Sequence, residues 1–148
     1  MYVDANLLVL LVVGIFDRGL VGRHRRTRQF RAEDYDLLSH VVANVGTILV
    51  TPNTLTEASN LLGYHSEPQR GQLMKTLRAL LDDVEESFVP SKVAARQDAF
   101  PRLGLTDAGL LESISERKPL LTADADLYVT ALGKNSKAAV NFHHLRGL

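Results

Sequence analysis

Four stretches of the chain place an acidic side chain where a short apolar run gives way to a helix. Asp4 follows "YV", Asp124 follows "PLLT", and Glu57 and Asp107 lie near the starts of two further expected helices. Carboxylate oxygens are hard ligands that suit Mg²⁺ or Mn²⁺. Such an ion can lower the pKa of a bound water and offset charge on a phosphoryl group. Together the four acids could therefore support metal-dependent hydrolysis of a phosphodiester.

Each acid also has a simpler interpretation as a helix cap. Glu57 stands three residues after Thr54, which fits a capping box, and the helix dipole favours Asp107 and Asp124 near helix N-termini. Asp4 is the weakest candidate for a cap, because the apolar segment around it would bury its charge unless the carboxylate is paired or metal-bound. Without a cation, converging carboxylates repel one another and some take up protons. Their shared location favours a metal site.

The segments that position these acids alternate between short apolar runs and helices. Strands are predicted at residues 2–3, 47–50, 119–122 and 138–142, with a weaker candidate at 87–90, and helices at residues 7–16, 33–45, 52–62, 69–84, 107–116 and 127–132. Apolar runs without alternation are typical of parallel strands that are buried on both faces. The chain is predicted to be a single α/β domain of residues 1–148, a three-layer α/β/α sandwich with a mostly parallel sheet. Ligands bind such sheets beyond the carboxyl ends of the strands, where the four acids are expected.

Composition narrows the possible chemistry. The chain has 148 residues, of which 45% are hydrophobic and 23% charged, with 17 basic and 17 acidic side chains and no cysteine. Disulfides, zinc-thiolate sites and thiol nucleophiles are excluded, and a reducing compartment, the cytoplasm, is expected. The longest apolar run, Leu7 to Phe16, has ten residues, whereas a membrane-spanning helix needs about 20. The run also follows Asp4 rather than a basic segment, so neither a membrane span nor a signal peptide is expected.

The acidic stretches resemble the four acidic motifs of PIN-domain ribonucleases. They are, in order, "VDANL" at Val3 to Leu7, Thr-x-x-Glu-Ala at Thr54 to Ala58, "LTDAGLL" at Leu105 to Leu111, and "LLTADADL" at Leu120 to Leu127. They are particularly similar to toxins of the virulence-associated-protein C type, and the match in order covers almost the whole chain. The resemblance implies a PIN fold and a Mg²⁺- or Mn²⁺-dependent endoribonuclease. Its catalytic, metal-binding quartet is matched here by Asp4, Glu57, Asp107 and Asp124.

The resemblance also assigns roles to neighbouring residues and to partners. Asp126 corresponds to a frequent additional acid that binds a second ion, and Asn6 and Thr122 correspond to polar residues that orient the carboxylates or a metal-bound water. In that family the activated water attacks phosphorus in line and leaves a 5′-phosphate, with no enzyme-bound intermediate. Members of the toxin type commonly form homodimers and are held inactive by a small antitoxin protein. A homodimer, an antitoxin and an RNA substrate are therefore the expected partners.

A basic segment separates the first two motifs and makes the interval from Asp4 to Glu57 longer than in compact toxins of this type. It holds six arginines and no acid between Arg18 and Arg31. The candidates for contacts with RNA phosphates are Arg23, Arg25, Arg26 and Arg28. Phe30 or Tyr35 could offer a stacking face for an unpaired base. The alternative is a solvated basic loop, which is a common feature of protein surfaces.

Two other functions compete with a nuclease. Phosphohydrolases of the haloacid-dehalogenase type also place an Asp after the first strand, but they need a second Asp two residues later, where this chain has Asn6. A PIN-like domain without catalysis, serving as a binding module, is the second alternative. The complete set of acids argues against it. The five histidines show no ligand-like spacing, and His143 and His144, adjacent near a strand end, are expected to point to opposite faces.

Overall fold

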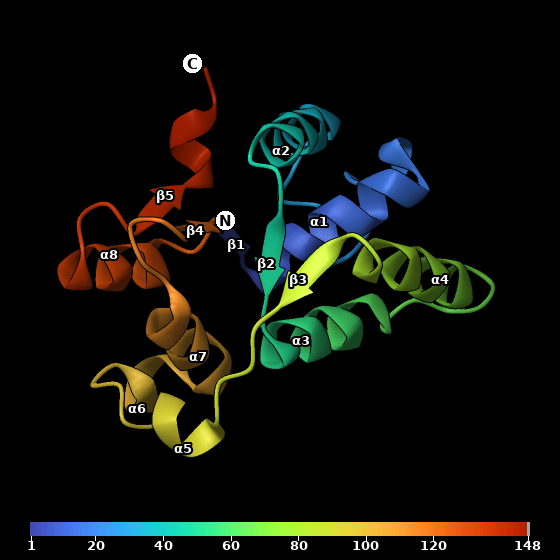
Figure 1. The fold of residues 1–148 in the computed structure, drawn as a ribbon. Coiled ribbons are helices and arrows are strands. Elements are labelled where there is room, and N and C mark those ends of the chain that lie inside the picture. Colours follow the sequence, from blue (N-terminus) through green and yellow to red (C-terminus); the bar gives the residue numbers. More distant parts are fainter. Residues whose placement is uncertain (148) are drawn as a thin grey trace.

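The computed structural model describes residues 1–147, which form an α/β sandwich around one parallel sheet (Figure 1). The strands are β1 (Tyr2–Val3), β2 (Ile48–Val50), β3 (Val84–Glu86), β4 (Leu120–Thr122) and β5 (Ala139–Asn141). They lie in the order β3-β2-β1-β4-β5, and every neighbouring pair is parallel. The predicted α/β class is confirmed, and the sheet is parallel throughout.

Helices cover both faces of the sheet. They are α1 (Ala5–Phe16), α2 (Ala32–Asn44), α3 (Pro52–Leu62), α4 (Gln69–Leu81), α5 (Ser91–Ala94), α6 (Phe100–Leu103), α7 (Leu105–Ser113) and α8 (Ala125–Lys134), with 3₁₀ turns η1 (Arg18–Leu20) and η2 (Phe142–Leu145). Because successive strand residues point to opposite faces, Val3 and Leu121 pack with α1 to α4, whereas Tyr2 and Leu120 pack with α7 and α8. Two hydrophobic cores therefore flank the sheet, as expected for three layers.

Helix α1 is the most deeply buried element. Each residue from Leu7 to Val13 is at most 3% exposed, which agrees with its apolar sequence on every side. The helix packs against the sheet and is itself covered by α2, α3 and α4. Gly14 allows α2 to approach closely, since a Cβ atom there would lie 2.1 Å from Cδ2 of Tyr35. No helix within residues 1–147 is long and apolar enough to cross a bilayer.

Several sequence-based boundaries were wrong. The strand expected at residues 87–90 lies at β3 instead, where Val84 is half-buried and the two glutamates are exposed. A strand at the edge of a sheet is held by backbone pairing on one side only, so it does not need an apolar run. The short helices α5 and α6 were not predicted, and α7 begins at Leu105 rather than at Asp107 because Gly104, with φ of +86°, turns the chain into it. The last strand ends at Asn141 rather than at Phe142, and His143 and His144 lie in the 3₁₀ turn η2 that follows it.

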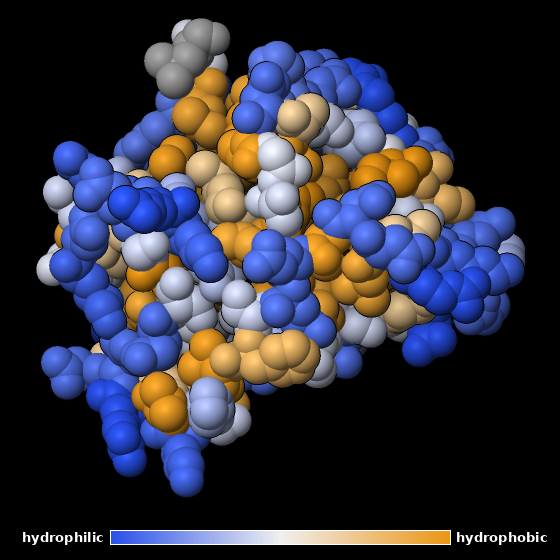
Figure 2. All heavy atoms as spheres, in the orientation of Figure 1, coloured by the Kyte–Doolittle hydropathy of each residue, from blue (hydrophilic) through white to orange (hydrophobic). Residues whose placement is uncertain are grey.

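The surface between α2 and α4 is hydrophobic. Figure 2 shows hydrophobic residues exposed between the hydrophilic outer faces of these two helices. A hollow of about 320 Å³ there is lined by apolar side chains that include Leu11 and Ile15 of α1, Val42 of α2 and Leu80 of α4. It lies away from the carboxyl ends of the strands, because α1 begins at that edge and ends near the hollow.

The close approach of α1 and α2 predicts the effect of filling the space at Gly14. We expect Gly14→Ala to destabilise the protein by about 1–3 kcal/mol, because the added methyl group overlaps the Tyr35 ring. Gly133→Ala in α8 is a matched control, since a Cβ atom there meets nothing within 4 Å. It should leave stability unchanged or slightly raised. Urea unfolding of both variants measures the difference, and equal stabilities would contradict the described packing.

Candidate active site at the carboxyl edge of the sheet

Asp4 is the buried centre of a hydrogen-bond network at the carboxyl end of β1. Its side chain is 4% exposed. One oxygen, Oδ1, accepts a hydrogen bond from the backbone N–H of Leu7 at 2.9 Å, so Asp4 caps α1 despite being the weakest candidate for a cap on sequence grounds. The other, Oδ2, accepts from the backbone N–H of Ala123 at 3.0 Å and from the hydroxyl of Thr122. Three hydrogen bonds thus compensate the burial of this carboxyl group.

Thr122 links Asp4 to Asp124. Its hydroxyl donates to Asp4 and accepts from the backbone N–H of Asp124 at 3.0 Å. The Oδ1 atom of Asp124 in turn accepts from the N–H of Leu127 at 3.0 Å and caps α8. A carboxylate has about four acceptor positions, of which Asp4 uses three and Asp124 one. Asp4 can therefore accept about one further ligand, whereas Asp124 is mostly free.

Glu57 and Asp107 do not act as caps. Thr51 caps α3 by accepting the N–H of Thr54 at 3.2 Å, so the capping box expected between Thr54 and Glu57 was wrong. Asp107 lies in the first turn of α7 without a capping hydrogen bond. Neither carboxyl group forms a hydrogen bond or ion pair with any of residues 1–147. These two acids have no structural partner that explains them.

A polar hollow separates the starts of α3 and α7. It measures about 300 Å³ and is lined by Asn53, Thr56, Glu57 and Asn60 of α3 and by Leu105 and Thr106 of α7. The two helices pack against each other. Glu57 thus faces the same hollow as the residue that precedes Asp107, and both helix starts lie at the carboxyl edge of the sheet (Figure 1).

The acids share one electrostatic environment. Burial, as the largest cause, and the negative charges of Asp124, Glu57, Asp4 and Asp126 together raise the pKa of Asp107 to about 7. Burial also raises the pKa of Asp4, and this effect outweighs the opposing effect of its hydrogen bonds. Carboxylates repel in this way when they are near one another without a compensating cation. The other four predicted acidic residues therefore lie within electrostatic reach of Asp107.

These side chains do not surround a single point. Within residues 1–147, no three His, Asp or Glu side chains are grouped closely enough to hold a metal ion. The donor types fit Mg²⁺ or Mn²⁺, since every candidate ligand is a carboxylate. Repulsion between unneutralised carboxylates favours the separated arrangement. Glu57 and Asp124 are exposed at the surface, so rotation of their side chains would bring oxygens closer to Asp107 without repacking the core.

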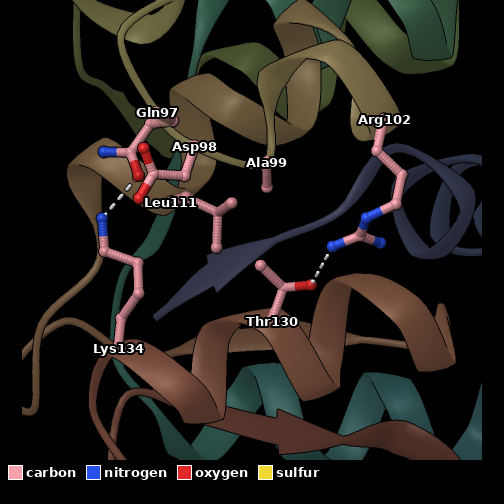
Figure 3. A pocket seen from close by; sticks show the side chains of 7 residues that line it. All are labelled: Gln97, Asp98, Ala99, Arg102, Leu111, Thr130 and Lys134. Carbon is pink, nitrogen blue, oxygen red and sulfur yellow. Dashed lines mark hydrogen bonds between the residues drawn. The ribbon is translucent and has the colours of Figure 1, made fainter.

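Asp126 forms an ion pair with an arginine that no sequence pattern indicated. Arg102 of α6 forms an ion pair with Asp126 and donates from Nη2 to the Thr130 hydroxyl at 3.0 Å. Figure 3 shows Arg102 reaching toward α8 across a pocket of about 340 Å³. At the other end of the pocket, Lys134 donates to Oε1 of Gln97 at 2.6 Å. Because α6 was not predicted from the sequence, its contact with Asp126 could not be predicted either.

The remaining predicted residues lie apart from the network. Asn6 is exposed on α1, and its side chain forms no hydrogen bond within the described residues. The arginine segment follows the far end of α1, a 12-residue helix, so the segment begins about 18 Å from Asp4 along the helix. The structure therefore does not bring the arginines close to the predicted acids at the carboxyl edge of the sheet.

The arginines differ in their surroundings. Arg23 lies 3.9 Å from a carboxylate oxygen of Asp17, and the guanidinium of Arg26 lies 4.5 Å from the centre of the Tyr64 ring. Arg25 and Arg28 are exposed and form no ion pair within residues 1–147. Phe30 is buried against Phe142, so its expected role as an exposed stacking face is wrong.

A pair of histidines, the buried His24 and the half-buried His65, lies at the same end of the molecule as the arginine segment. The rings of His24 and His65 have centroids 4.2 Å apart. Nδ1 of His24 accepts the backbone N–H of Arg26 at 3.0 Å, so the neutral ring carries its proton on Nε2. Burial lowers the pKa of His24 to about 4. A metal would need a free lone pair on Nε2, and this hydrogen bond therefore makes His24 a poor metal ligand.

Comparison with models of protein families, with curated proteins and with solved structures finds no match to this chain. The four acidic motifs and the geometry of the carboxyl edge therefore remain the guides to function.

The Thr122 hydroxyl predicts a stability difference between two variants. We expect Thr122→Val to lower the free energy of unfolding by about 1–3 kcal/mol, because it leaves the buried Asp4 carboxyl and the N–H of Asp124 with one partner fewer. Thr122→Ser keeps the hydroxyl, so its free energy of unfolding should fall by less, because only a methyl group is removed. Chemical denaturation measures both values. A valine variant as stable as the serine variant would contradict the network.

The raised pKa of Asp107 predicts a pH-dependent effect of its removal. In the folded state Asp107 binds its proton up to about pH 7, whereas the unfolded chain releases it near pH 3.8. The folded protein therefore loses stability as the pH rises through this window. In metal-free buffer, Asp107→Asn should be more stable than wild type by roughly 1–3 kcal/mol at pH 8 and nearly equal to it below pH 4. Unfolding curves at both pH values measure this difference, and a pH-independent difference would refute it.

Proposed function

We propose that this protein is a Mg²⁺- or Mn²⁺-dependent endoribonuclease that hydrolyses RNA phosphodiester bonds at the carboxyl edge of the sheet. The observation that carries the proposal is the hydrogen-bond link from Asp4 through Thr122 to Asp124. This link fixes two acids from neighbouring strands beside Asp107, which has no cationic partner within residues 1–147. A half-buried carboxylate without a partner, as Asp107 is, is costly, and such groups cluster at functional sites.

The four acids of the quartet have distinct parts in this proposal. Asp4 is held rigidly and offers about one free acceptor position, while Glu57, Asp107 and Asp124 offer mostly free oxygens. When bound, a divalent ion would supply an activated water and offset negative charge on the phosphate. Asp126 would join a second ion only by giving up its ion pair with Arg102.

The choice of RNA as substrate follows the resemblance to PIN-domain ribonucleases. The toxin-type assignment, with a homodimer and a small antitoxin, rests on the same resemblance, whereas the cytoplasmic location follows from the absence of cysteine. The geometry of the carboxyl edge favours phosphodiester hydrolysis over the haloacid-dehalogenase alternative. Asn6, the position where that chemistry needs a second carboxylate, is an exposed amide on α1.

The proposal includes a second contact with RNA at the arginine segment. Arg25 and Arg28 are exposed and lack ion pairs within residues 1–147, so they are available to phosphates, whereas Arg23 and Arg26 have intramolecular partners. Because the segment begins about 18 Å from Asp4 along the buried helix α1, an RNA strand that contacts both places must span at least this distance over the helices that cover α1.

The direct test is cleavage of single-stranded RNA with Mg²⁺ or Mn²⁺, with and without chelator. Wild type should cleave only with the ion. We expect Asp4→Asn and Asp107→Asn to reduce the rate by about 100-fold or more, since loss of residues that merely support a metal ligand costs 10- to 100-fold. Asp83→Asn is the matched control, because this exposed acid precedes β3 and lies at the amino edge of the sheet.

Metal binding supplies a second measurement that does not depend on activity. Mn²⁺ should raise the melting temperature of wild type, because binding to the folded state alone stabilises it. The increase should be smaller in Asp107→Asn and unchanged in Asp83→Asn. RNA cleavage that is equal in wild type and both quartet variants, or that persists in chelator, would rule out the proposed site.

A further inference from the structure

Phe88 is an exposed aromatic side chain beside the candidate site. It is 76% exposed and follows β3 at the carboxyl edge of the sheet. A single exposed apolar side chain is common in proteins and needs no explanation. Phe88 differs because it forms one wall of a hollow of about 310 Å³, whose other walls are residues 51–53 at the start of α3, residues 89–90 and Gly109 of α7.

The floor of this hollow is open because Gly109 has no side chain. A Cβ atom at Gly109 would meet no other atom within 4 Å, so the space is not needed for packing between α7 and its neighbours. Glycine in the middle of a helix is less favourable than alanine by about 1 kcal/mol. The structure thus contains an unfavourable helix residue at a place where a methyl group would project into the hollow.

The hollow adjoins the polar hollow that Glu57 lines. Asn53 lines both this hollow and the polar hollow that contains Glu57, and the two residues lie one helical turn apart on α3. Gly109 lies two residues after Asp107 on α7. Since β3 is separated from β1 by one strand and neighbouring strands are about 4.8 Å apart, the end of β3, two residues before Phe88, lies about 10 Å from the end of β1. This span suits a nucleotide that adjoins the cleaved phosphate.

The lining indicates the chemistry of the occupant. None of the residues that line the hollow carries a positive charge, so it does not suit a phosphate. It combines an exposed aromatic face with the amide of Asn53, which can both donate and accept hydrogen bonds. Unpaired nucleobases are recognised by stacking on aromatic rings together with hydrogen bonds to their edges.

We propose that this hollow is a nucleobase subsite, in which Phe88 stacks on a base of the RNA substrate, Gly109 leaves room for the ring, and Asn53 contacts its edge. The inference rests on the proposed function because it takes RNA as the ligand. It adds a determinant of substrate binding that is separate from the acids and from the arginine segment.

Binding of a fluorescent single-stranded RNA in chelator tests the subsite without catalysis. We expect Phe88→Leu to weaken binding about 5- to 150-fold and Phe88→Tyr to retain it, because tyrosine preserves the stacking face. Gly109→Ala should weaken binding about tenfold by filling the hollow with a methyl group. Gly133→Ala, a helix glycine with equally open surroundings, should bind as wild type does.

Salt dependence separates stacking from phosphate contacts. Stacking releases no counterions, so Phe88→Leu should lower affinity while leaving the slope of log affinity against log salt unchanged. The subsite is refuted if Phe88→Leu and Gly109→Ala bind RNA as wild type does, or if wild type does not bind single-stranded RNA. Phe88-dependent binding without metal-dependent cleavage would uphold the subsite and reject the proposed nuclease activity.

Discussion

The burial of the Asp4 carboxyl group is the constraint on which the architecture of the carboxyl edge depends. A carboxyl group removed from water is tolerated only when its oxygens have partners. Here the partners come from two directions, the first turn of α1 and the turn between β4 and α8. These hydrogen bonds therefore fix the start of α1 relative to β4. The same turn positions Asp124, so one buried group determines where two of the acids lie.

Parallel pairing then gathers the remaining acids without requiring any contact between them. Each strand ends at the same edge, and each following helix begins there. Glu57 lies on α3 and Asp107 on α7, and these two helices pack against each other. The charges of the other acids act on Asp107, whose half-buried carboxyl group is intermediate in exposure between the buried Asp4 and the exposed acids Glu57, Asp124 and Asp126. The fold thus places negative charge at the carboxyl edge of the sheet, where the sequence supplies few basic side chains to compensate it.

The sequence predicted the parts of the structure that depend on buried apolar runs. The strands that became β1, β2, β4 and β5 and the apolar helix α1 follow directly from such runs, and the parallel sheet follows from their lack of alternation. Prediction failed where backbone geometry or tertiary contact decides the outcome. The exposed strand β3 has no apolar pattern, α7 begins at a glycine with positive φ, and the cap of α3 is Thr51 rather than Thr54. The partner of Asp126 lies 24 residues away in a four-residue helix, which no local pattern indicates.

The acidic run at residues 82–86 has a consequence for association between molecules. Its last two residues are the exposed glutamates of β3, and β3 is an outer strand of the sheet. An outer strand offers unpaired backbone groups to any other extended chain, and charged side chains on it oppose such pairing. A second copy that paired along β3 would bring glutamates of both copies together, which like charges on facing strands disfavour. Self-association by sheet extension is thereby opposed at this edge, and two copies that associate on this side must do so through their helices.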